Sequence, residues 1–248
     1  CMRRARTRSA GDRVCARQMS RAMRIAVRPF GVLGTAMASS GAVRKVAQGP
    51  VPGLAILDPA GLRFIRTDGP KGAGGAAGQI YRWLEIDEHA AFPAPVREAI
   101  QAPLQAKLQY YGVRACLHVV GPDFSQRRCS EDEALAELTQ AYAAALREFA
   151  RARLGGLRLL PISSGIFAGD LKPQLPSLTA TALRSAFDAL PERDQHAVSM
   201  ARLDMCIFEE DEHALYAEAF ALETERAEQF TASLGMGRTP TQPWQTGK

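Results

Sequence analysis

Long hydrophobic runs and cysteine pairs are missing from this chain. No stretch of 18 apolar residues occurs in its 248 residues, so we expect no transmembrane helix and no membrane partner. The five cysteines form no C-x-x-C pair and have no metal-ligand spacing to the four histidines. We therefore expect reduced thiols in an intracellular, cytoplasmic protein, and we predict no metal and no other cofactor.

Acidic residues are almost absent from the first 50 positions. Residues 1–50 hold 11 Lys and Arg and a single acid, Asp12, for a net charge of +10, whereas residues 51–248 carry −5. The overall charge of +5 thus belongs to the N-terminal segment. A basic, nucleic-acid-binding surface on the folded body is not expected.

The composition divides the chain into three segments. Residues 1–23 form a basic segment that we expect to be disordered, residues 24–230 a folded domain, and residues 231–248 a flexible tail rich in Pro, Gln and Thr. For the basic segment three interpretations stay open. It is an organellar transit peptide, an arm whose residues 3–28 contact nucleic-acid phosphates weakly, or an extension unrelated to the domain, since the chain begins at Cys1.

Apolar runs of strand length alternate with helical patterns. Strands are predicted at 24–32, 43–47, 54–57, 62–66, 115–120, 157–162 and 197–208, and helices at 79–84, 93–100, 130–154, 177–190 and 211–222. The run Ser130-Glu-Asp-Glu133 is a capping box that starts the longest helix. The alternation predicts a three-layer α/β fold with a mainly parallel central sheet.

Two glycine-containing loops are the candidate ligand site. Ser163-Ser-Gly165 follows the strand at 157–162, and Gly72–Gly78 precedes a helix. Such loops can direct several backbone N–H groups at a phosphate, and ligands of open α/β sheets bind at the carboxyl ends of strands. The plainer alternatives are an ordinary strand-to-helix turn and a flexible surface loop. A dinucleotide-binding fingerprint is disfavoured, because Thr67–Lys71 separates the glycines from the preceding strand.

Four stretches resemble the macro domains, a family of ADP-ribose-binding modules, in the expected order. They are Gly72-Ala-Gly-Gly-Ala-Ala-Gly-Gln-Ile-Tyr-Arg82, Leu117-His-Val-Val-Gly-Pro122, Pro161-Ile-Ser-Ser-Gly-Ile-Phe-Ala-Gly169 and Met205-Cys-Ile-Phe-Glu-Glu-Asp211. The resemblance covers roughly residues 54–222. It implies a three-layer α/β/α fold with a mixed, mainly parallel sheet, and ADP-ribose or an ADP-ribosylated protein as the partner.

The resemblance also implies where a ligand would bind. Gly74, Gly75 and Ala76 would face the diphosphate from one side, and Ser164, Gly165, Ile166 and Phe167 from the other. Phe208 stands where the family often places an aromatic ring that stacks on adenine. For both phenylalanines, plain core packing is the alternative.

Several family positions carry unsuitable residues here. The usual adenine-binding aspartate aligns with Val32 or Pro50, the second asparagine of the first ligand strand with Gly61, and the acid of the glycine loop with Ala77. None of these side chains can accept the adenine hydrogen bond or orient a water molecule. The resemblance with these losses implies a diverged domain that binds ADP-ribose or a related nucleotide without efficient catalysis.

Two alternatives remain. One is an ADP-ribosyl or phosphoester hydrolase that uses a relocated acid, for which Asp58 and Asp170 are the catalytic candidates and Asp68 lies near the same loops. The other is a non-binding domain retained for protein contacts. His118, within a predicted strand, is interpreted as a core histidine with its hydrogen bonds satisfied.

Overall fold

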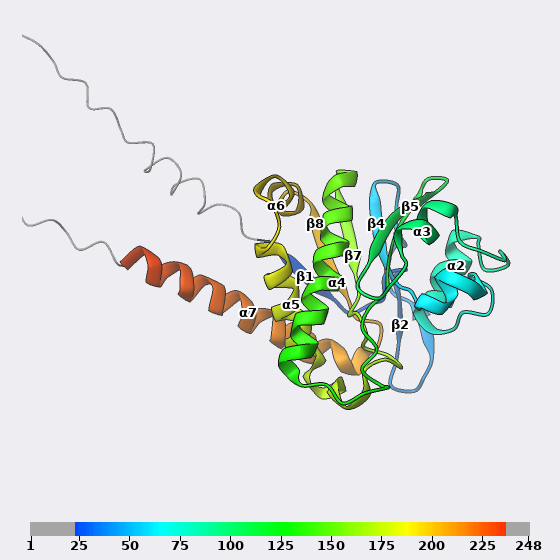
Figure 1. The fold of residues 1–248 in the computed structure, drawn as a ribbon. Coiled ribbons are helices and arrows are strands. Elements are labelled where there is room, and N and C mark those ends of the chain that lie inside the picture. Colours follow the sequence, from blue (N-terminus) through cyan, green and yellow to red (C-terminus); the bar gives the residue numbers. More distant parts are fainter. Residues whose placement is uncertain (1–22, 237–248) are drawn as a thin grey trace, which may run out of the picture.

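A six-stranded sheet forms the centre of the molecule, which is described for residues 23–236 by a computed structural model (Figure 1). The strand order is β1-β8-β7-β4-β6-β5. All neighbouring pairs are parallel except the antiparallel pair of β5 and β6. The strands are β1 Ile25–Arg28, β4 Leu54–Pro59, β5 Ala106–Tyr111, β6 Arg114–Val119, β7 Gly156–Leu159 and β8 Arg202–Cys206. A separate antiparallel hairpin consists of β2 Thr35–Met37 and β3 Val43–Lys45.

Helices flank this sheet and complete the three-layer α/β/α arrangement that the sequence predicted. Helices α4 and α5 pack on each other, α2 packs against β4, and α3 packs against β5. The helices are α2 Gly75–Leu84, α3 Ala94–Ala99, α4 Glu131–Ala152, α5 Leu175–Asp188, α6 Glu192–Ser199 and α7 Glu210–Met236, with a π-helical turn at Phe64–Asp68 and a 3-10 helix at Gly169–Gln174.

Helix α7 is longer than the helix predicted at 211–222. It packs against α5 and β1 near its start and then leaves the body of the molecule (Figure 1). None of the helices within residues 23–236 combines the length and the apolar character needed to cross a membrane. The predicted basic segment, apart from Met23, and residues 237–248 of the predicted tail lie outside the described residues.

Parallel pairing directs the carboxyl ends of β1, β8, β7, β4 and β6 to one edge of the sheet, which we call the carboxyl edge. The central strand β4 is flanked by β7 and β6, and Ala55, Ile56, Leu57 and Asp58 are fully buried in it. A continuous apolar run is typical of a strand covered on both faces. The segments that follow these five strands are therefore neighbours.

Three local predictions were wrong. Residues 62–66 alternate like a strand, but they form part of the π-helical turn region, in which only Ile65 of Phe64–Asp68 is buried. Residues 197–199 close helix α6, so the last strand is shorter than predicted. Strand β5 was missed because it is a half-exposed antiparallel strand without a clear apolar pattern.

The strand predicted at 54–57 is longer than expected. Strand β4 continues through Asp58 to Pro59, and Asp58 pairs in register with His118 of β6. A buried carboxylate inside a parallel strand is unexpected from sequence because charge is costly to bury without a partner.

The structure contains the capping box predicted at the start of α4, and its contribution to stability can be tested. The Ser130 hydroxyl oxygen accepts from the Glu133 N–H, and a Glu133 carboxylate oxygen accepts from the Ser130 N–H at 3.0 Å. We expect Ser130→Ala to lower the free energy of unfolding by about 1 kcal/mol, measured by urea denaturation. The control Ser130→Thr keeps the hydroxyl and should stay near the parent value; equal losses in both variants would contradict the capping role.

Candidate functional site

The loop after β7 is held by a buried tyrosine. Tyr142 of α4 accepts a hydrogen bond from the Ile162 N–H at 2.9 Å and donates one to the Leu160 carbonyl at 3.4 Å. Burial raises the pKa of the Tyr142 hydroxyl, so it stays protonated and able to donate. The helix thereby fixes the point where strand β7 turns into the loop.

Contacts with the segment after β6 fix the same loop further along. Ser163, in a left-handed conformation with φ 62°, donates its hydroxyl to the Pro122 carbonyl at 2.6 Å. The Phe124 N–H donates to the Phe167 carbonyl at 2.9 Å. Gly121 leaves no room for a side chain, since an added Cβ would lie 2.3 Å from Ile162 Cγ2. The loops after β6 and β7 therefore form one rigid unit.

The predicted residues of this loop present their backbone to solvent. Gly165 and Ile166 are exposed, Phe167 is half-buried, and the Ser164 hydroxyl donates to the Pro161 carbonyl. Within residues 23–236, the N–H groups of Gly165, Ile166 and Phe167 donate to no protein acceptor. These three donors are available to a bound anion.

The glycine loop ends in the first turn of α2, four residues earlier than the predicted helix start. Gly74 is the N-cap, Gly75 has φ 57°, and among the described side chains none caps this end. Helix geometry leaves the first N–H groups without intrahelical acceptors. The predicted residues Gly74, Gly75 and Ala76 are all exposed at this end.

Helix α2 points its N-terminus toward the carboxyl edge. Its other end lies beside the start of β6, because Glu85, the C-cap of α2, forms an ion pair with Arg114 at 2.8 Å. The start of β6 marks the opposite edge of the sheet. The glycine loop and the loop after β7 thus both open at the carboxyl edge.

Phe208 lies at the end of β8, next to the end of β1. It is 37% exposed, its ring would contact a side chain added at Gly31, and its carbonyl accepts from the Met37 N–H at 2.8 Å. The partly open ring is free to stack on a ligand from its exposed side.

A buried arginine in β7 was missed by the sequence reasoning. Arg158 is 6% exposed and donates to the carbonyls of Val32 and Gln48, both at 2.9 Å. Its guanidinium also lies over the Phe30 ring, 5.2 Å from the centroid. An arginine between leucines in a buried strand is the only sequence signal for this contact, which joins the segment after β1 to the middle of the sheet.

The two candidate acids are placed differently. Asp170 is exposed in the first turn of the 3-10 helix that follows the β7 loop. Asp58 is fully buried and is bonded through Oδ2 to His118 Nδ1 at 2.7 Å. A general base must reach the water that it activates, so the geometry does not suit Asp58 for that role. His118, which also contacts the Tyr111 hydroxyl at 2.8 Å, is a core histidine as interpreted from the sequence.

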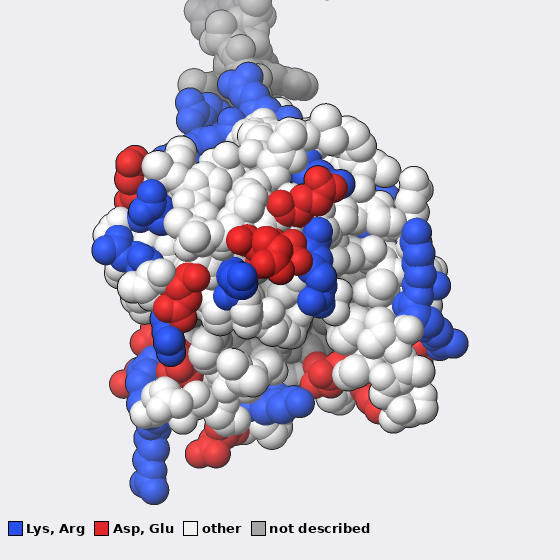
Figure 2. All heavy atoms as spheres, turned by 90° about the vertical axis from the view of Figure 1, so that its right-hand side faces the viewer, with Lys and Arg blue, Asp and Glu red and all other residues white. Residues whose placement is uncertain are grey.

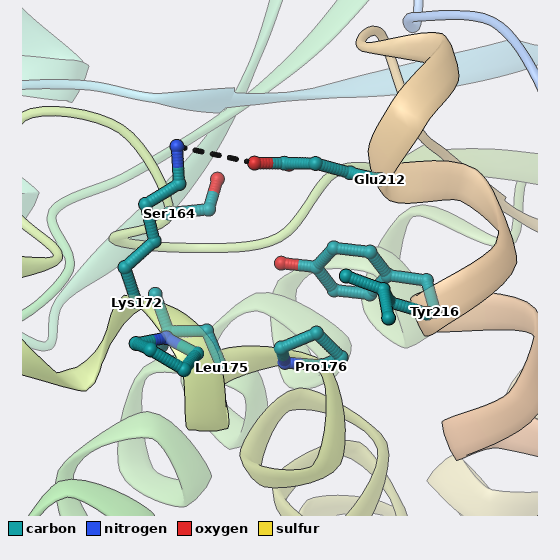
Figure 3. A pocket seen from close by; sticks show the side chains of 8 residues that line it. Ser164, Lys172, Leu175, Pro176, Glu212 and Tyr216 are labelled. Atoms are coloured by element: carbon teal, nitrogen blue, oxygen red, sulfur yellow. Dashed lines mark ion pairs between the residues drawn. The ribbon is translucent and has the colours of Figure 1, made fainter.

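A small cavity adjoins the β7 loop between the 3-10 helix, α5 and the start of α7 (Figure 3). Its volume is about 230 Å³, below the roughly 300–1,000 Å³ of typical ligand pockets. Lys172 and Glu212 form an ion pair of 3.3 Å across it. It is lined by Ser164, Lys172, Pro173, Leu175, Pro176, Glu212, Leu215 and Tyr216. The cavity is too small to hold an entire dinucleotide-sized ligand.

The face on the right-hand side of Figure 1 carries acidic and basic side chains interspersed among uncharged ones (Figure 2). Basic side chains gather at the upper rim of this view, next to the grey residues, and along its right-hand edge.

Comparison with solved structures identifies this architecture. A Trypanosoma brucei macrodomain in complex with ADP matches with TM-score 0.50 and 19% identity, over 79% of this chain and 69% of that chain. An Oceanobacillus iheyensis macrodomain with MES bound matches with TM-score 0.48 and 16% identity, over 82% and 92%. The chain has the macro domain fold. No family model matches the chain, and no curated protein does.

The macro domain fold is thus combined with a diverged sequence. Of the positions at which the expected family side chains are missing, Val32 is buried beneath the carboxyl edge, while Pro50, Gly61 and Ala77 are half-buried. The Val32 carbonyl accepts a hydrogen bond from Arg158.

The Arg158 contacts predict local loosening when they are removed. Arg158→Met removes the donor from the carbonyl of buried Val32 and from the carbonyl of exposed Gln48, and the unpaired Val32 carbonyl costs about 1–3 kcal/mol. We expect amide hydrogen exchange in residues 32–48 to accelerate by about tenfold or more, while exchange in β4 and β6 stays unchanged. The matched control is Arg202→Met, which removes a more exposed arginine paired with Asp204 at 2.8 Å. Unchanged protection in residues 32–48 would contradict the anchoring role.

Proposed function

We propose that this chain binds ADP-ribose or a related nucleotide, free or attached to a protein, at the carboxyl edge of its sheet and does not hydrolyse it efficiently. The observation that carries the proposal is the pair of backbone-donor loops. Gly74–Ala76 at the start of α2 and Ser164–Phe167 after β7 both open at this edge. The fold match to a macrodomain in complex with ADP supports the same ligand class.

The chemistry of these loops suits a diphosphate. Backbone N–H groups at a helix N-terminus attract an anion through hydrogen bonds and the helix dipole. Three further N–H groups, those of Gly165, Ile166 and Phe167, have no protein acceptor within the described residues. Phe208, partly exposed at the end of β8, is the candidate for stacking on a base, an interaction worth about 1–3 kcal/mol in other nucleotide sites.

The absence of efficient hydrolysis follows from the side chains around the loops. Gly61 and Ala77 cannot position a water molecule, and Asp58 is enclosed in the core. Asp170, exposed beyond the end of the β7 loop, and Asp68, exposed and paired with Arg63, are the remaining acids. The proposed activity is therefore recognition.

Negative charge introduced into either loop should weaken ADP-ribose binding. An added Cβ meets no atom within 4 Å at Gly74 or Gly165, so Gly74→Glu and Gly165→Glu should fold normally. Each places a carboxylate beside the diphosphate, and we expect each to weaken ADP-ribose binding by about tenfold or more. Isothermal titration of ADP-ribose into the purified chain measures this.

The matched control is Gly155→Glu. Gly155 immediately precedes β7 at the opposite edge of the sheet and has room for a side chain, with the nearest atom 4.0 Å from the added Cβ. It should bind like the parent chain. Equal affinity in all four proteins would refute the proposed site, and no heat from the parent at millimolar ligand would refute nucleotide binding.

Turnover provides a separate test. With an ADP-ribosylated protein as substrate, we expect release of ADP-ribose no faster than in a buffer control, because no side chain at the loops activates water. Release is followed by chromatography of the free nucleotide. Turnover that disappears in Asp170→Asn would contradict the binding-only function and assign the acid to Asp170.

A further inference from the structure

Three potential metal ligands meet in the core between β4 and β6. Asp58 of β4 pairs in register with His118 of β6, and Cys116 stands two residues before His118, on the same face of the strand. All three side chains are 0% exposed. One carboxylate oxygen, one ring nitrogen and the thiol sulfur lie within 4.8 Å of one another.

Two buried polar atoms beside this cluster form no hydrogen bond of regular geometry. They are Asp58 Oδ1 and the Tyr81 hydroxyl, which face each other: burial, and after it the charge of Asp58 and a hydrogen bond to it, raise the pKa of the Tyr81 hydroxyl. Buried polar atoms without a well-formed hydrogen bond are rare in cores because each costs about 1–3 kcal/mol. Asp58 Oδ1 is therefore an acceptor that a bound ion could use.

We propose that Asp58, Cys116 and His118 bind a divalent transition ion of the zinc class. Asp58 supplies both carboxylate oxygens, Cys116 its thiolate and His118 its Nδ1, which makes four ligand atoms. Nitrogen, thiolate and carboxylate ligands are those that zinc prefers. The two negative ligands balance the charge of the ion, so the buried site carries no net charge.

The three ligand atoms lie within 4.8 Å of one another, and their distances must change for the cluster to accept the ion. Four ligand atoms at usual zinc distances place N and O about 3.3 Å apart and N and S about 3.6 Å apart, and the narrow bite of the Asp58 carboxylate makes the coordination a distorted tetrahedron. His118 Nδ1 is 2.7 Å from Asp58 Oδ2 and 3.9 Å from Cys116 Sγ. The short N–O contact is that of a shared proton, which the ion replaces as the carboxylate moves outward and the sulfur inward.

The neighbouring tyrosines act as supporting groups. Tyr111 lies 2.8 Å from His118 Nε2 and can either donate to that nitrogen or accept from it. When the ion takes Nδ1, the imidazole proton resides on Nε2 and is donated to Tyr111, while the Cys116 proton is released. The Tyr81 hydroxyl can then donate to the Asp58 carboxylate, whose ligand atoms are now fixed by the ion.

The site would be structural. It is closed to solvent on every side, with Tyr81 and Phe92 packed near the His118 ring, so no position is open for a substrate or a reactive water. The ion would join β4 to β6 at the centre of the sheet. The sequence shows no spacing motif because 57 residues separate Asp58 from the Cys-x-His pair.

Metal content of the full chain tests the proposal directly. The chain is purified from cells grown with zinc and, separately, with cobalt, and its metal is quantified by mass spectrometry and absorption spectroscopy. We expect about one ion per chain and, with cobalt, a thiolate-to-metal absorption band in the near ultraviolet. A parent chain without bound metal overturns the proposal.

Matched cysteine variants identify the ligand. Cys116→Ser should lose the thiolate band and at least nine tenths of the metal, whereas Cys206→Ser, which changes another buried cysteine in β8, should keep both. His118→Gln is a second ligand variant in case Cys116→Ser does not fold, as judged by circular dichroism. Metal retained in either folded ligand variant overturns the assignment.

Tyr111→Phe tests whether Tyr111 supports the ion site without itself binding the ion. It preserves all four ligand atoms, so it should still bind one ion, with affinity about 10- to 100-fold lower as measured by competition with a chelator. Unchanged affinity would remove Tyr111 from the site, and complete loss of the ion would contradict the ligand set.

Discussion

Parallel pairing of the buried strand β4 with β6 and β7 is the constraint on which the rest of the structure depends. It directs successive strand ends to one edge, so that segments distant in sequence become neighbours. The helices then cover both faces of a sheet whose central strands are largely buried. The carboxyl edge is the part of this arrangement where backbone groups remain uncovered.

The candidate site at that edge is built mainly from main chain. Tyr142, Ser163 and Arg158 each contact backbone atoms of the strand ends and loops, which positions the segments without facing a ligand. Rigid loops with free N–H groups need few specific side chains to hold a diphosphate. A site of this kind can therefore persist in a sequence that has lost the acid and amide side chains expected of the fold.

Buried polar groups divide into two sets on the two sides of β4. Arg158 of β7 satisfies carbonyls beneath the carboxyl edge, whereas Asp58 and His118 form a cluster with β5 and α2. Arg158 donates through two of its nitrogen atoms to main-chain carbonyls and leaves Nε without a partner, while in the second set Asp58 Oδ1 and the Tyr81 hydroxyl form no regular hydrogen bond. The first set anchors the main chain, and the second holds the three residues proposed to bind an ion.

Patterns with a strong local cause could be predicted well. The capping box at Ser130 and the apolar run that became β7 were visible in the sequence, and the resemblance of four stretches to macro domains implied the fold that the structure has. The π-helical turn at Phe64–Asp68 and the edge strand β5 could not be predicted, because their order of apolar and polar residues is compatible with more than one secondary structure. For them the neighbouring elements decide the conformation.

The sequence by itself determined the class of fold and the two glycine-containing segments, since periodicity and turn chemistry act between residues close along the chain. Only the tertiary structure decided that Asp58 belongs to the core, that it meets His118 and Cys116, and that Arg158 holds Val32 and Gln48. These contacts depend on strand register and on the direction of each side chain. Both are set by packing among elements that lie tens of residues apart.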